Sequence, residues 1–502
     1  MQRFQGAMRE QGLLMPYDLT EWLPEDHLAR FIVDITDKLD LSAIYRKYQG
    51  KGTAAYDPKL LLALLFYGYS TGIFSSRKIE AATYDSVAFR FIAGNHHPDH
   101  DTIAAFRKRF LFEIKGFFKE ILLIGKELGL VKLGNIYIDG TKIQADASRH
   151  KAMSYEYMKR LEAQLESEIG QLLEMASKQD EKENGQQLEI PEELKLRKDR
   201  LEKIKLAKAV VEARAAERYK IEKEAYDQQM EKREQQAEKT GKKPRGKKPE
   251  PPSEEPKESD QYNFTDPESR IMKTSRGFDQ CYNAQAAVNE DMLIVGAYSN
   301  AHANDKEEFI PAVASVDGEL GVVTTAVADS GYYSENNVLK IQEKDIEPII
   351  AMSREKHNSF LETYLMKEEL QEGDITVAGQ MRQRLKSREG SVTYKKRKQT
   401  VEPVFGIIKE ALGFRRFSLR GEKQTDGEWS LVCLAYNLKR LFKLSNAKKP
   451  IFPGFFMFQN GIFMLRNGIR YIQSKIQLNL TMKHEYNILY FILWKNLTPT
   501  GS

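Results

Sequence analysis

The sequence predicts an α/β protein with an all-helical N-terminal region, then a mixed five-stranded sheet flanked by helices, with a helical hairpin inserted into the sheet. Three observations predict this fold. Apolar residues repeat at helical spacing up to about residue 125. Between residues 131 and 352 they alternate with polar residues or form short apolar runs, as strands do. A stretch of mixed charge, residues 151–260, splits the strand-rich region.

The N-terminal region, residues 1–125, has its clearest helix start at Asp57-Pro58, a capping residue followed by a first-turn proline. The next residues form an apolar stripe that we expect to pack in a core: Leu60, Leu61, Leu64 and Leu65. A later helix follows the turn HHPDHDT, where Asp101 or Thr102 can act as the cap. Turn-forming residues explain the histidines of this segment better than a metal site does.

The first predicted strand is IYID, in which Ile136 and Ile138 alternate with other residues and which ends at Asp139. Two narrow apolar seams then predict an antiparallel helical hairpin over residues 151–240, formed by Met158, Leu161, Leu165, Ile169 and Leu172 and by Leu194, Leu201, Ile204 and Val211. A solvated charged hairpin is favoured over a DNA-contacting arm. Residues 241–260 have almost no apolar side chains and are predicted to be a disordered linker.

The sheet resumes after the linker and continues to about residue 445. The predicted elements are strands at 278–288 and 292–298, a helix at 304–317, a strand ending at Asp329, a helix at 335–343, a strand at 347–352 and a helix carrying Glu402. His302, Asn304 and Asp305 are expected to cap the helix that they precede. The segment EWSLVCLAYNLKRLFKL reads as the last helix of the domain. Residues 446–502 form a C-terminal extension whose role the sequence does not indicate.

Three carboxylates stand where burial would be costly without a positive partner. Asp139 and Asp329 end apolar strands, and Glu402 lies in an otherwise apolar first turn of a helix. Two strand-end aspartates and a helical glutamate make an all-oxygen pocket that suits Mg²⁺ or Mn²⁺. Such a pocket can hold two ions about 3.5–4 Å apart that prepare a phosphodiester for in-line attack. We therefore predict Asp139, Asp329 and Glu402 as catalytic residues and metal ligands, with Asp146 no more than an outer support.

Six segments in a fixed order resemble the DDE transposases of bacterial insertion sequences that carry an InsH-type helical N-terminal domain. They are HPDHDTIAAFRKRF, IYIDGTKIQADAS, DPESRIMKT, YNAQAAVN, ADSGYYSENN and YKKRKQTVEPVFGIIK. The resemblance implies an RNase H-like catalytic domain made of residues 131–150 and 261–445, with the three acids binding two Mg²⁺ or Mn²⁺ ions. It implies cleavage at element ends and strand transfer into target DNA. The implied partners are double-stranded DNA, at terminal inverted repeats and targets, and further copies of the chain in a homodimer or larger complex.

The family pattern around the glutamate also implies DNA contacts. It consists of a tyrosine, two residues, an arginine, three residues, the glutamate, six residues and a lysine. Tyr394 and Lys409 fit it, but Arg397 lies one residue too far from Glu402, and Lys398 has the spacing that the arginine should have. Either of these two is therefore the expected phosphate contact. DNA-end binding by the helical domain is implied as well, with contacts from a basic turn that by itself indicates only a partly basic helix: Arg107, Lys108 and Arg109.

Composition sets further limits. The net charge of +5 over 502 residues does not by itself imply a nucleic-acid partner, but basic side chains far outnumber acidic ones between Arg382 and Lys443. Two cysteines exclude a disulfide framework and a cysteine zinc site. The start lacks a signal-peptide core and no apolar run is long enough for a membrane span, which predicts a soluble cytoplasmic protein. The alternative functions are a nuclease of the same fold that does not transpose, and a catalytically inactive DNA-binding relative.

Overall fold

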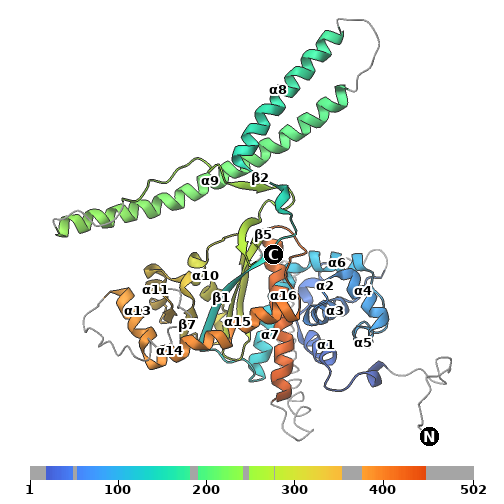
Figure 1. Ribbon diagram of the computed structural model, residues 1–502. Helices are drawn as coiled ribbons and strands as arrows, with labels where there is room; N and C mark the ends of the chain where they lie inside the picture. Colours follow the sequence, from blue (N-terminus) through green and yellow to red (C-terminus); the bar gives the residue numbers. More distant parts are fainter. Residues whose placement is uncertain are drawn as a thin grey trace, which may run out of the picture. The chain divides into compact units, whose positions relative to one another are not determined.

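The computed structural model describes residues 19–48, 54–180, 190–240, 248–275, 277–352 and 376–447 (Figure 1). The chain divides into two compact units, residues 1–442 and residues 443–502. Every element below belongs to the first unit, except the end of helix α16. The predicted C-terminal extension, 446–502, lies outside the described residues apart from its first two positions.

The N-terminal region is helical throughout its described part, as predicted. Its helices are η1 (Leu19–Trp22), α1 (Leu28–Lys38), α2 (Ser42–Tyr45), α3 (Pro58–Ser70), α4 (Ser76–Asp85), α5 (Val87–Ile92), α6 (His100–Arg109) and α7 (Leu111–Glu127). α3 is buried on nearly every side rather than along one stripe, since Leu62 and Phe66 are as buried as Leu61 and Leu64. This helix is therefore the centre of the helical region.

One of the predicted helix caps is confirmed and another is wrong. Asp57 caps α3 as predicted, because its carboxylate accepts a hydrogen bond from the backbone N–H of Lys59 at 2.9 Å. At α6 the cap is Asp99, which accepts from the N–H of Thr102 at 2.7 Å, and not Asp101 or Thr102 as predicted. The extended backbone of Asp99, next to Pro98, places its side chain over the free N–H groups of the first turn.

The mixed sheet contains six strands among the described residues, one more than predicted. They are β1 (Asn135–Gln144), β4 (Arg270–Thr274), β5 (Gly277–Asn289), β6 (Ile294–Asn300), β7 (Thr325–Ala328) and β8 (Glu347–Ile350). The order across the sheet is β6–β5–β1–β7–β8, with β4 beside the first part of β5. β1, β7 and β8 are parallel, whereas β5 is antiparallel to its neighbours. β4 escaped prediction because only Met272 of its five residues is buried, so no alternation marks it.

β1 is longer than predicted, and the expectation that it ends at Asp139 is wrong. Its antiparallel pairing with β5 continues without a break to Gln144, opposite Cys281. Its parallel pairing with β7 stops at Tyr137, opposite Val327. The apolar alternation ends near Asp139, but β5 goes on supplying backbone hydrogen bonds beyond that point. Asp139 therefore lies inside a strand and just past the end of that strand's parallel neighbour.

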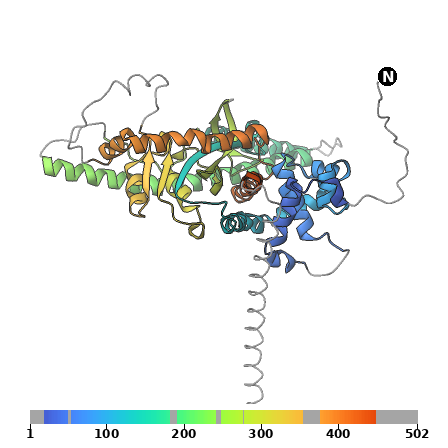
Figure 2. The same cartoon turned by 90° about the horizontal axis from the view of Figure 1, so that it is seen from below.

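Helices cover the sheet. They are η3 (Asp305–Glu307), α10 (Phe309–Ala314), η4 (Gly318–Leu320), η5 (Ser330–Tyr332), α11 (Glu335–Gln342), α13 (Val377–Lys386), α14 (Arg388–Lys395), η6 (Lys396–Gln399), α15 (Val401–Gly406), the π-helical turn η7 (Ile407–Ala411) and α16 (Glu422–Ala447). Figure 2 shows α14 and α15, in orange, along one face of the sheet. The predicted helix 304–317 is split into η3 and α10. Buried Trp429 of α16 donates from its indole to the carbonyl of Gln285 at 2.9 Å, which ties α16 to β5.

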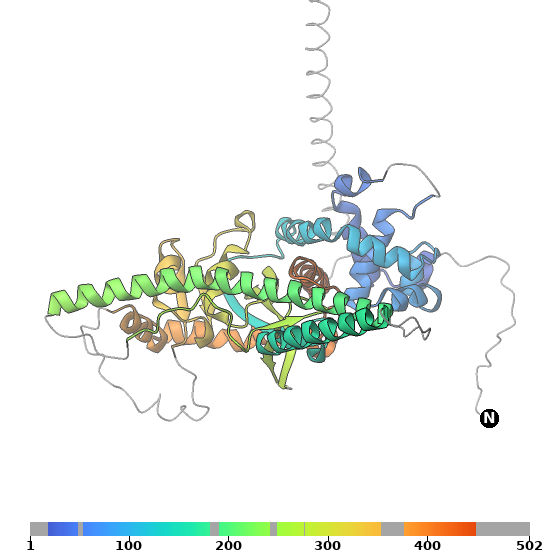
Figure 3. The ribbon, with the colours of Figure 1, turned by 90° about the horizontal axis from the view of Figure 1, so that it is seen from above.

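Two long helices follow β1 in the chain and pack against each other as an antiparallel pair (Figures 1 and 3). They are α8 (Tyr155–Asp180) and α9 (Ile190–Thr240), and the short strands β2 (Ala152–Ser154) and β3 (Gln261–Asn263) pair at their base. The predicted seams meet in a separate buried cluster that contains Tyr155, Met158, Leu161, Leu165, Ile204, Ala207 and Val211. The hairpin thus has a small core of its own.

The segment that returns from the hairpin is more ordered than a linker. Residues 241–247 lie outside the described part, but 248–260 are described and contain neither helix nor strand. Asp260 pairs with Arg218 at 3.0 Å, and its carbonyl accepts from the N–H of Tyr155 at 2.7 Å. The predicted disorder is therefore wrong for this part, because its charged side chains find partners at the base of the hairpin.

Two predictions from composition concern the cysteines and membrane-spanning segments. Cys281 and Cys433 are both buried and unpaired. No helix within the described ranges combines the length and apolar character needed to cross a membrane. Burial in a core, rather than a disulfide, therefore accounts for both cysteines.

Candidate active site

Two of the predicted acids are brought side by side by the parallel strands β1 and β7. The last paired residues are Tyr137 and Val327, and Asp139 and Asp329 each lie two positions further along their strands. Asp329 follows the last residue of β7 and caps η5, accepting a hydrogen bond from the N–H of Gly331 at 2.8 Å. Parallel neighbours carry equivalent positions at the same edge of the sheet. The two carboxylates therefore share one edge.

The third predicted acid, Glu402, comes from the first turn of α15. This helix packs on β1 and β5 through buried side chains that include Val401 and Val404. Arg397, in η6, joins the helix to the strand: its guanidinium lies 3.0 Å from Glu402 Oε1 and 3.3 Å from Asp139 Oδ2. The helical acid and the strand acid thus share one arginine.

The three acids are also close enough to interact electrostatically. Burial raises the pKa of the Asp139 carboxyl to about 7, and the negative charges of Asp329 and Glu402 add to that increase. Arg397 opposes it, as does the backbone N–H of Gly140, which donates to Asp139 at 2.9 Å. Clusters of acids with a raised pKa are typical of functional sites.

The chemistry of this donor set fits a hard divalent cation, because all three acids offer carboxylate oxygens. Within the described ranges, however, no three acidic, histidine or cysteine side chains form a ready-made metal site. Arg397 contributes to this arrangement by forming one ion pair with Asp139 and another with Glu402. Its Nε is buried and has no hydrogen-bond partner in the described part of the chain. The guanidinium of Arg397 therefore lies between the carboxylates of Asp139 and Glu402.

A fourth acid, Asp305, lies beside this group. Its Oδ1 accepts hydrogen bonds from Lys142 Nζ at 3.1 Å, Asn283 Nδ2 at 2.7 Å and Gln285 Nε2 at 3.0 Å. The sequence indicated only a capping role, but Asn304 is the residue that caps η3, accepting from the N–H of Lys306 at 3.1 Å. Asp305, the first residue of η3, instead links side chains of β1 and β5.

Tyr332 completes this polar network. It is buried, and its hydroxyl donates to Gln285 Oε1 at 2.6 Å. Burial raises the pKa of Tyr332 far above its ordinary value, and the charges of Asp139, Asp305 and Asp329 add to the effect. A signal for this network was present in the sequence, because Asn283 and Gln285 interrupt the otherwise apolar run of β5 and buried amides require partners.

The predicted DNA contacts near Glu402 occupy different environments. The Arg397 side chain is 12% exposed and engaged with the acids, whereas Lys398 is exposed. Tyr394 is partly buried on α14, within electrostatic range of Arg397. Lys409, on η7, donates to the carbonyl of Lys142 at 3.3 Å, and burial lowers its pKa. Of the two candidates for the family arginine, Arg397 is the one that reaches the carboxylates.

On α6 the structure corrects one predicted DNA contact. Arg107 is only 7% exposed, and its guanidinium donates to the hydroxyl of Tyr69 at 2.7 Å and to the carbonyl of Phe74 at 3.2 Å. The same hydroxyl lies 3.4 Å from the buried carboxylate of Glu428 on α16. The prediction of Arg107 as a DNA contact is therefore wrong, since its charge is balanced inside the protein. Lys108 and Arg109 are exposed, and their DNA contacts stay predictions.

Two other acids lie outside the group. Asp146 pairs with Arg416 at 2.7 Å and Arg420 at 2.8 Å, so it anchors the loop before α16. Glu308 is buried and accepts from Asn300 Nδ2 at 2.6 Å and from His302 Nδ1 at 2.8 Å. Both carboxylates are occupied by structural partners.

Comparison with known proteins agrees with this arrangement. Residues 17–109 match a transposase domain (DUF772), which corresponds to the helical N-terminal region. Residues 366–442 match a transposase DDE domain, which includes Arg397, Glu402 and Lys409. Searches of curated proteins and of solved structures gave no significant match. The two transposase models match opposite ends of the first unit in the order that the motifs predict, and both matches support a DDE transposase of an insertion sequence.

Proposed function

We propose that this transposase cleaves DNA at the ends of its element in a metal-dependent reaction and then joins the freed 3′-hydroxyl to target DNA. The observation that carries the proposal is the meeting of Asp139, Asp329 and Glu402. The first two lie at equivalent positions beyond a parallel strand pair, and the third shares Arg397 with Asp139.

The strand order supports an RNase H-like catalytic fold. Read in chain order, β1, β5 and β6 form an antiparallel meander, and β7 and β8 then extend the sheet on the other side of β1 with parallel strands. The acids stand on the first strand, after the fourth strand of this set, and on the helix α15 that follows the fifth. This is the arrangement that the resemblance to DDE transposases implies.

The reaction consists of two displacements at phosphorus. In the first, water attacks the phosphodiester at the element end, the bond from phosphorus to the 3′-oxygen breaks, and that oxygen leaves as a 3′-hydroxyl after taking up a proton. In the second, this hydroxyl attacks a phosphodiester of the target and releases a target 3′-hydroxyl, so the number of phosphodiester bonds is unchanged. Mg²⁺ or Mn²⁺, one or two ions held by Asp139, Asp329 and Glu402, would stabilise the charge that develops on the phosphate oxygens.

The basic residues of the site would bind and orient the substrate. Arg397 is positioned at the acids, where its guanidinium would contact the phosphate of a bound DNA strand. Lys409 and Tyr394 flank it on the same polypeptide segment. We assign the phosphate contact of the family arginine to Arg397 rather than Lys398, because only Arg397 contacts the carboxylates.

Single substitutions of the acids test the proposal. Asp139→Ala, Asp329→Ala and Glu402→Ala should each abolish Mg²⁺-dependent cleavage and strand transfer, since loss of one such group costs several kcal/mol, or at least ~100-fold in rate. DNA binding in a gel shift should remain close to that of the wild type. Glu343→Ala is the matched control, because this acid is exposed at the end of α11. A Glu402→Ala protein with near-normal turnover would remove that residue from the mechanism.

The same assay separates the alternatives. Cleavage without joining of the 3′-end to a target duplex would favour a nuclease, and DNA binding without any metal-dependent cleavage would favour an inactive relative. Substrates come from the DNA that flanks the gene, where terminal inverted repeats are expected.

We propose that the α8–α9 hairpin pairs protomers or contacts flanking DNA when two element ends are held together. It has its own buried cluster, and both signs of charge line its surface, which suits a protein partner. Replacing residues 155–260 by a short Gly/Ser loop keeps the β2–β3 pair and should leave a folded sheet. Size-exclusion chromatography with element-end DNA then tests the role, and normal assembly of paired ends by the deletion variant would refute it.

A further inference from the structure

A cavity of about 270 Å³ opens directly beside Asp139. Gly140, the next residue, lines it, and four of the lining side chains are cationic: Lys142, Lys273, Lys409 and Arg415. No carboxylate lines the cavity. These residues come from β1, from β4 and from η7 with the loop after it, so three separate stretches of the chain bring positive charge to one place.

The four cations are not all neutralised by the protein. Lys142 is held by Asp305 at 3.1 Å, and Arg415 pairs with Glu410 on its solvent side. Lys273 and Lys409 have no carboxylate partner within the described part of the chain. Cations that converge in a partly enclosed site repel one another unless an anion is present, and the low dielectric of the site strengthens both effects. The cavity therefore has the charge of an anion site.

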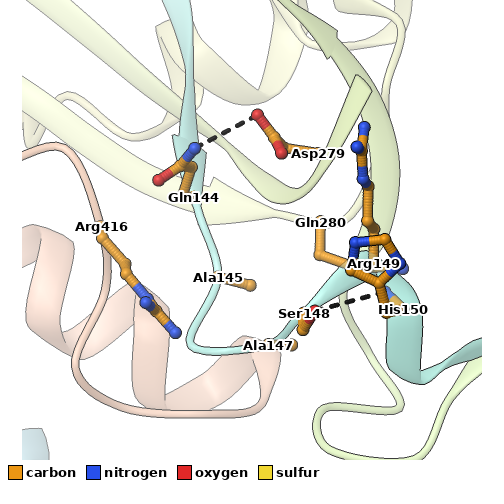
Figure 4. Close-up of a pocket in the computed structure, with 9 residues that line it drawn as sticks. All are labelled: Gln144, Ala145, Ala147, Ser148, Arg149, His150, Asp279, Gln280 and Arg416. Carbon is orange, nitrogen blue, oxygen red and sulfur yellow. Dashed lines mark hydrogen bonds between the residues drawn. The ribbon is translucent and has the colours of Figure 1, made fainter. Parts of the chain in front are cut away.

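A second cavity, of about 500 Å³, continues from the first. The two share Gln144, and in the second Arg416 lies on one side with Arg149 and His150 on the other (Figure 4). Its single acid, Asp279, accepts a hydrogen bond from Gln144 Nε2 at 3.2 Å. Arg149 and His150 form η2, directly before β2 at the base of the hairpin.

Together the cavities follow β1 away from the carboxylates. From Asp139 to Gln144 the strand advances about 17 Å at ~3.3 Å per residue. A DNA strand in a duplex carries one phosphate per ~3.4 Å of helix axis, and its phosphates lie farther apart along the strand itself, so a path of this length can meet more than one phosphate. A row of anions with this spacing matches a row of cations better than a single small anion does.

We propose that these two cavities bind the phosphodiester backbone of the DNA strand that leaves the active site, with Lys142, Lys273 and Arg415 as backbone contacts in addition to Lys409. The path runs from Asp139 along β1 to the base of the hairpin. The inference rests on the proposed function for the identity of the strand, but the binding itself is testable without cleavage.

The first test is the salt dependence of binding to a duplex of about 30 base pairs. Each lost phosphate contact lowers the slope of log K against log salt by about 0.9, so the double variant Lys273→Gln/Arg415→Gln should lower it by about 1.8. Lys340→Gln/Lys344→Gln is the matched control, because both lysines are exposed near the end of α11, and it should leave the slope unchanged. Equal melting temperatures show that each variant folds, and Lys273→Gln alone serves if the double variant does not.

The second test is crosslinking. Cys281 and Cys433 are buried, so a cysteine introduced by Lys273→Cys takes up a thiol-specific photocrosslinker selectively. It should crosslink to the duplex, and the equivalent Lys340→Cys protein should not.

The outcomes distinguish this inference from the proposed function. An unchanged slope with no crosslink, or absence of DNA binding by the wild type, overturns the cavity assignment even if the wild type cleaves DNA. A reduced slope with a crosslink supports the assignment even if cleavage is absent, and in that case only the proposed reaction fails.

Discussion

Two basic segments, both predicted to contact DNA, have very different surroundings in the structure. On α6, Arg107 is buried and its guanidinium donates to Tyr69 and Phe74, close to the buried Glu428. On η6, Arg397 is also largely buried, but it pairs with Asp139 and Glu402. The Nε atoms of both arginines are buried without a partner in the described part of the chain, so the difference lies in the groups that each guanidinium contacts. A buried arginine with neutral and acidic structural partners is part of the core. One that joins two carboxylates at a sheet edge marks a candidate functional site.

The largest expected effect tests the first half of this comparison. Arg107→Ala should lower the free energy of unfolding by about 3–5 kcal/mol, because it removes the positive charge near the buried Glu428 and the donor to the Tyr69 hydroxyl and the Phe74 carbonyl. Chemical denaturation measures this change. Lys108→Ala, at the next position and exposed, is the control and should change stability by less than about 1 kcal/mol. A small effect of Arg107→Ala would mean that the arginine is available for other partners.

The second prediction concerns Arg397. Arg397→Ala should reduce the rate of Mg²⁺-dependent cleavage by about 100-fold or more, because it removes a charged donor from the reacting phosphate. Its effect on stability should be smaller than that of Arg107→Ala, since Glu402 is 43% exposed and keeps its water. Lys398→Ala, measured in parallel, should cost less than about tenfold. The reverse ranking would transfer the phosphate contact to Lys398.

A third prediction concerns the exposed part of the α6 segment. Lys108→Ala/Arg109→Ala should lower the salt slope of DNA binding by about 1.8 while leaving the fold intact. Binding to element-end DNA at several salt concentrations measures it. If the slope stays the same, the basic turn of α6 is solvated surface and the helical domain binds DNA elsewhere.

The smallest expected effect comes from a third ionic network, between His302 and the buried Glu308. The hydrogen bond to Glu308 raises the pKa of His302 above 6.5, so its stabilisation is present below that pH and is lost as pH rises through the folded-state pKa. His302→Gln should therefore destabilise the protein at about pH 5.5 more than at about pH 8.5. The difference should be below about 1 kcal/mol, because the His302 side chain is 64% exposed. Equal effects at both pH values would show that His302 is not charged in the folded state.

Sequence patterns predicted most of the fold because buried strands and helices have apolar residues at regular intervals along the sequence. β5, β7 and β8 lie within a few residues of their predicted positions, and the hairpin seams meet as expected. β4 and the second half of β1 were missed for different reasons. β4 is the neighbour of β5 in the chain, but only Met272 of it is buried, so it shows no alternation. The second half of β1 takes its hydrogen bonds from β5, a partner distant in the sequence, and local pattern carries no record of such pairing.

The candidate site was predictable in part. Asp139, Asp329 and Glu402 stand out because a carboxylate beside apolar residues is costly to bury without a positive partner. The place of Asp305 was not predictable, because its three donors come from other elements, β1 and β5. The burial of Arg107 was equally hidden, since it depends on Glu428, more than three hundred residues further along the chain.

The base of the hairpin has a consequence for how the sheet assembles. β1 and β5 are neighbours in space but are separated by residues 145–276, and pairing them first would close a loop of that length. α8 and α9 pack through a buried cluster near the base of the hairpin, where β2 also pairs with β3. With that base closed, only residues 145–151 and 264–276 remain to be closed. The effective loop is roughly sixfold shorter, which lowers the closure cost by about 1.5 kcal/mol at ~0.6 kcal/mol per doubling of length. A hairpin that forms early would in this way bring the strand that carries Asp139 to its antiparallel partner.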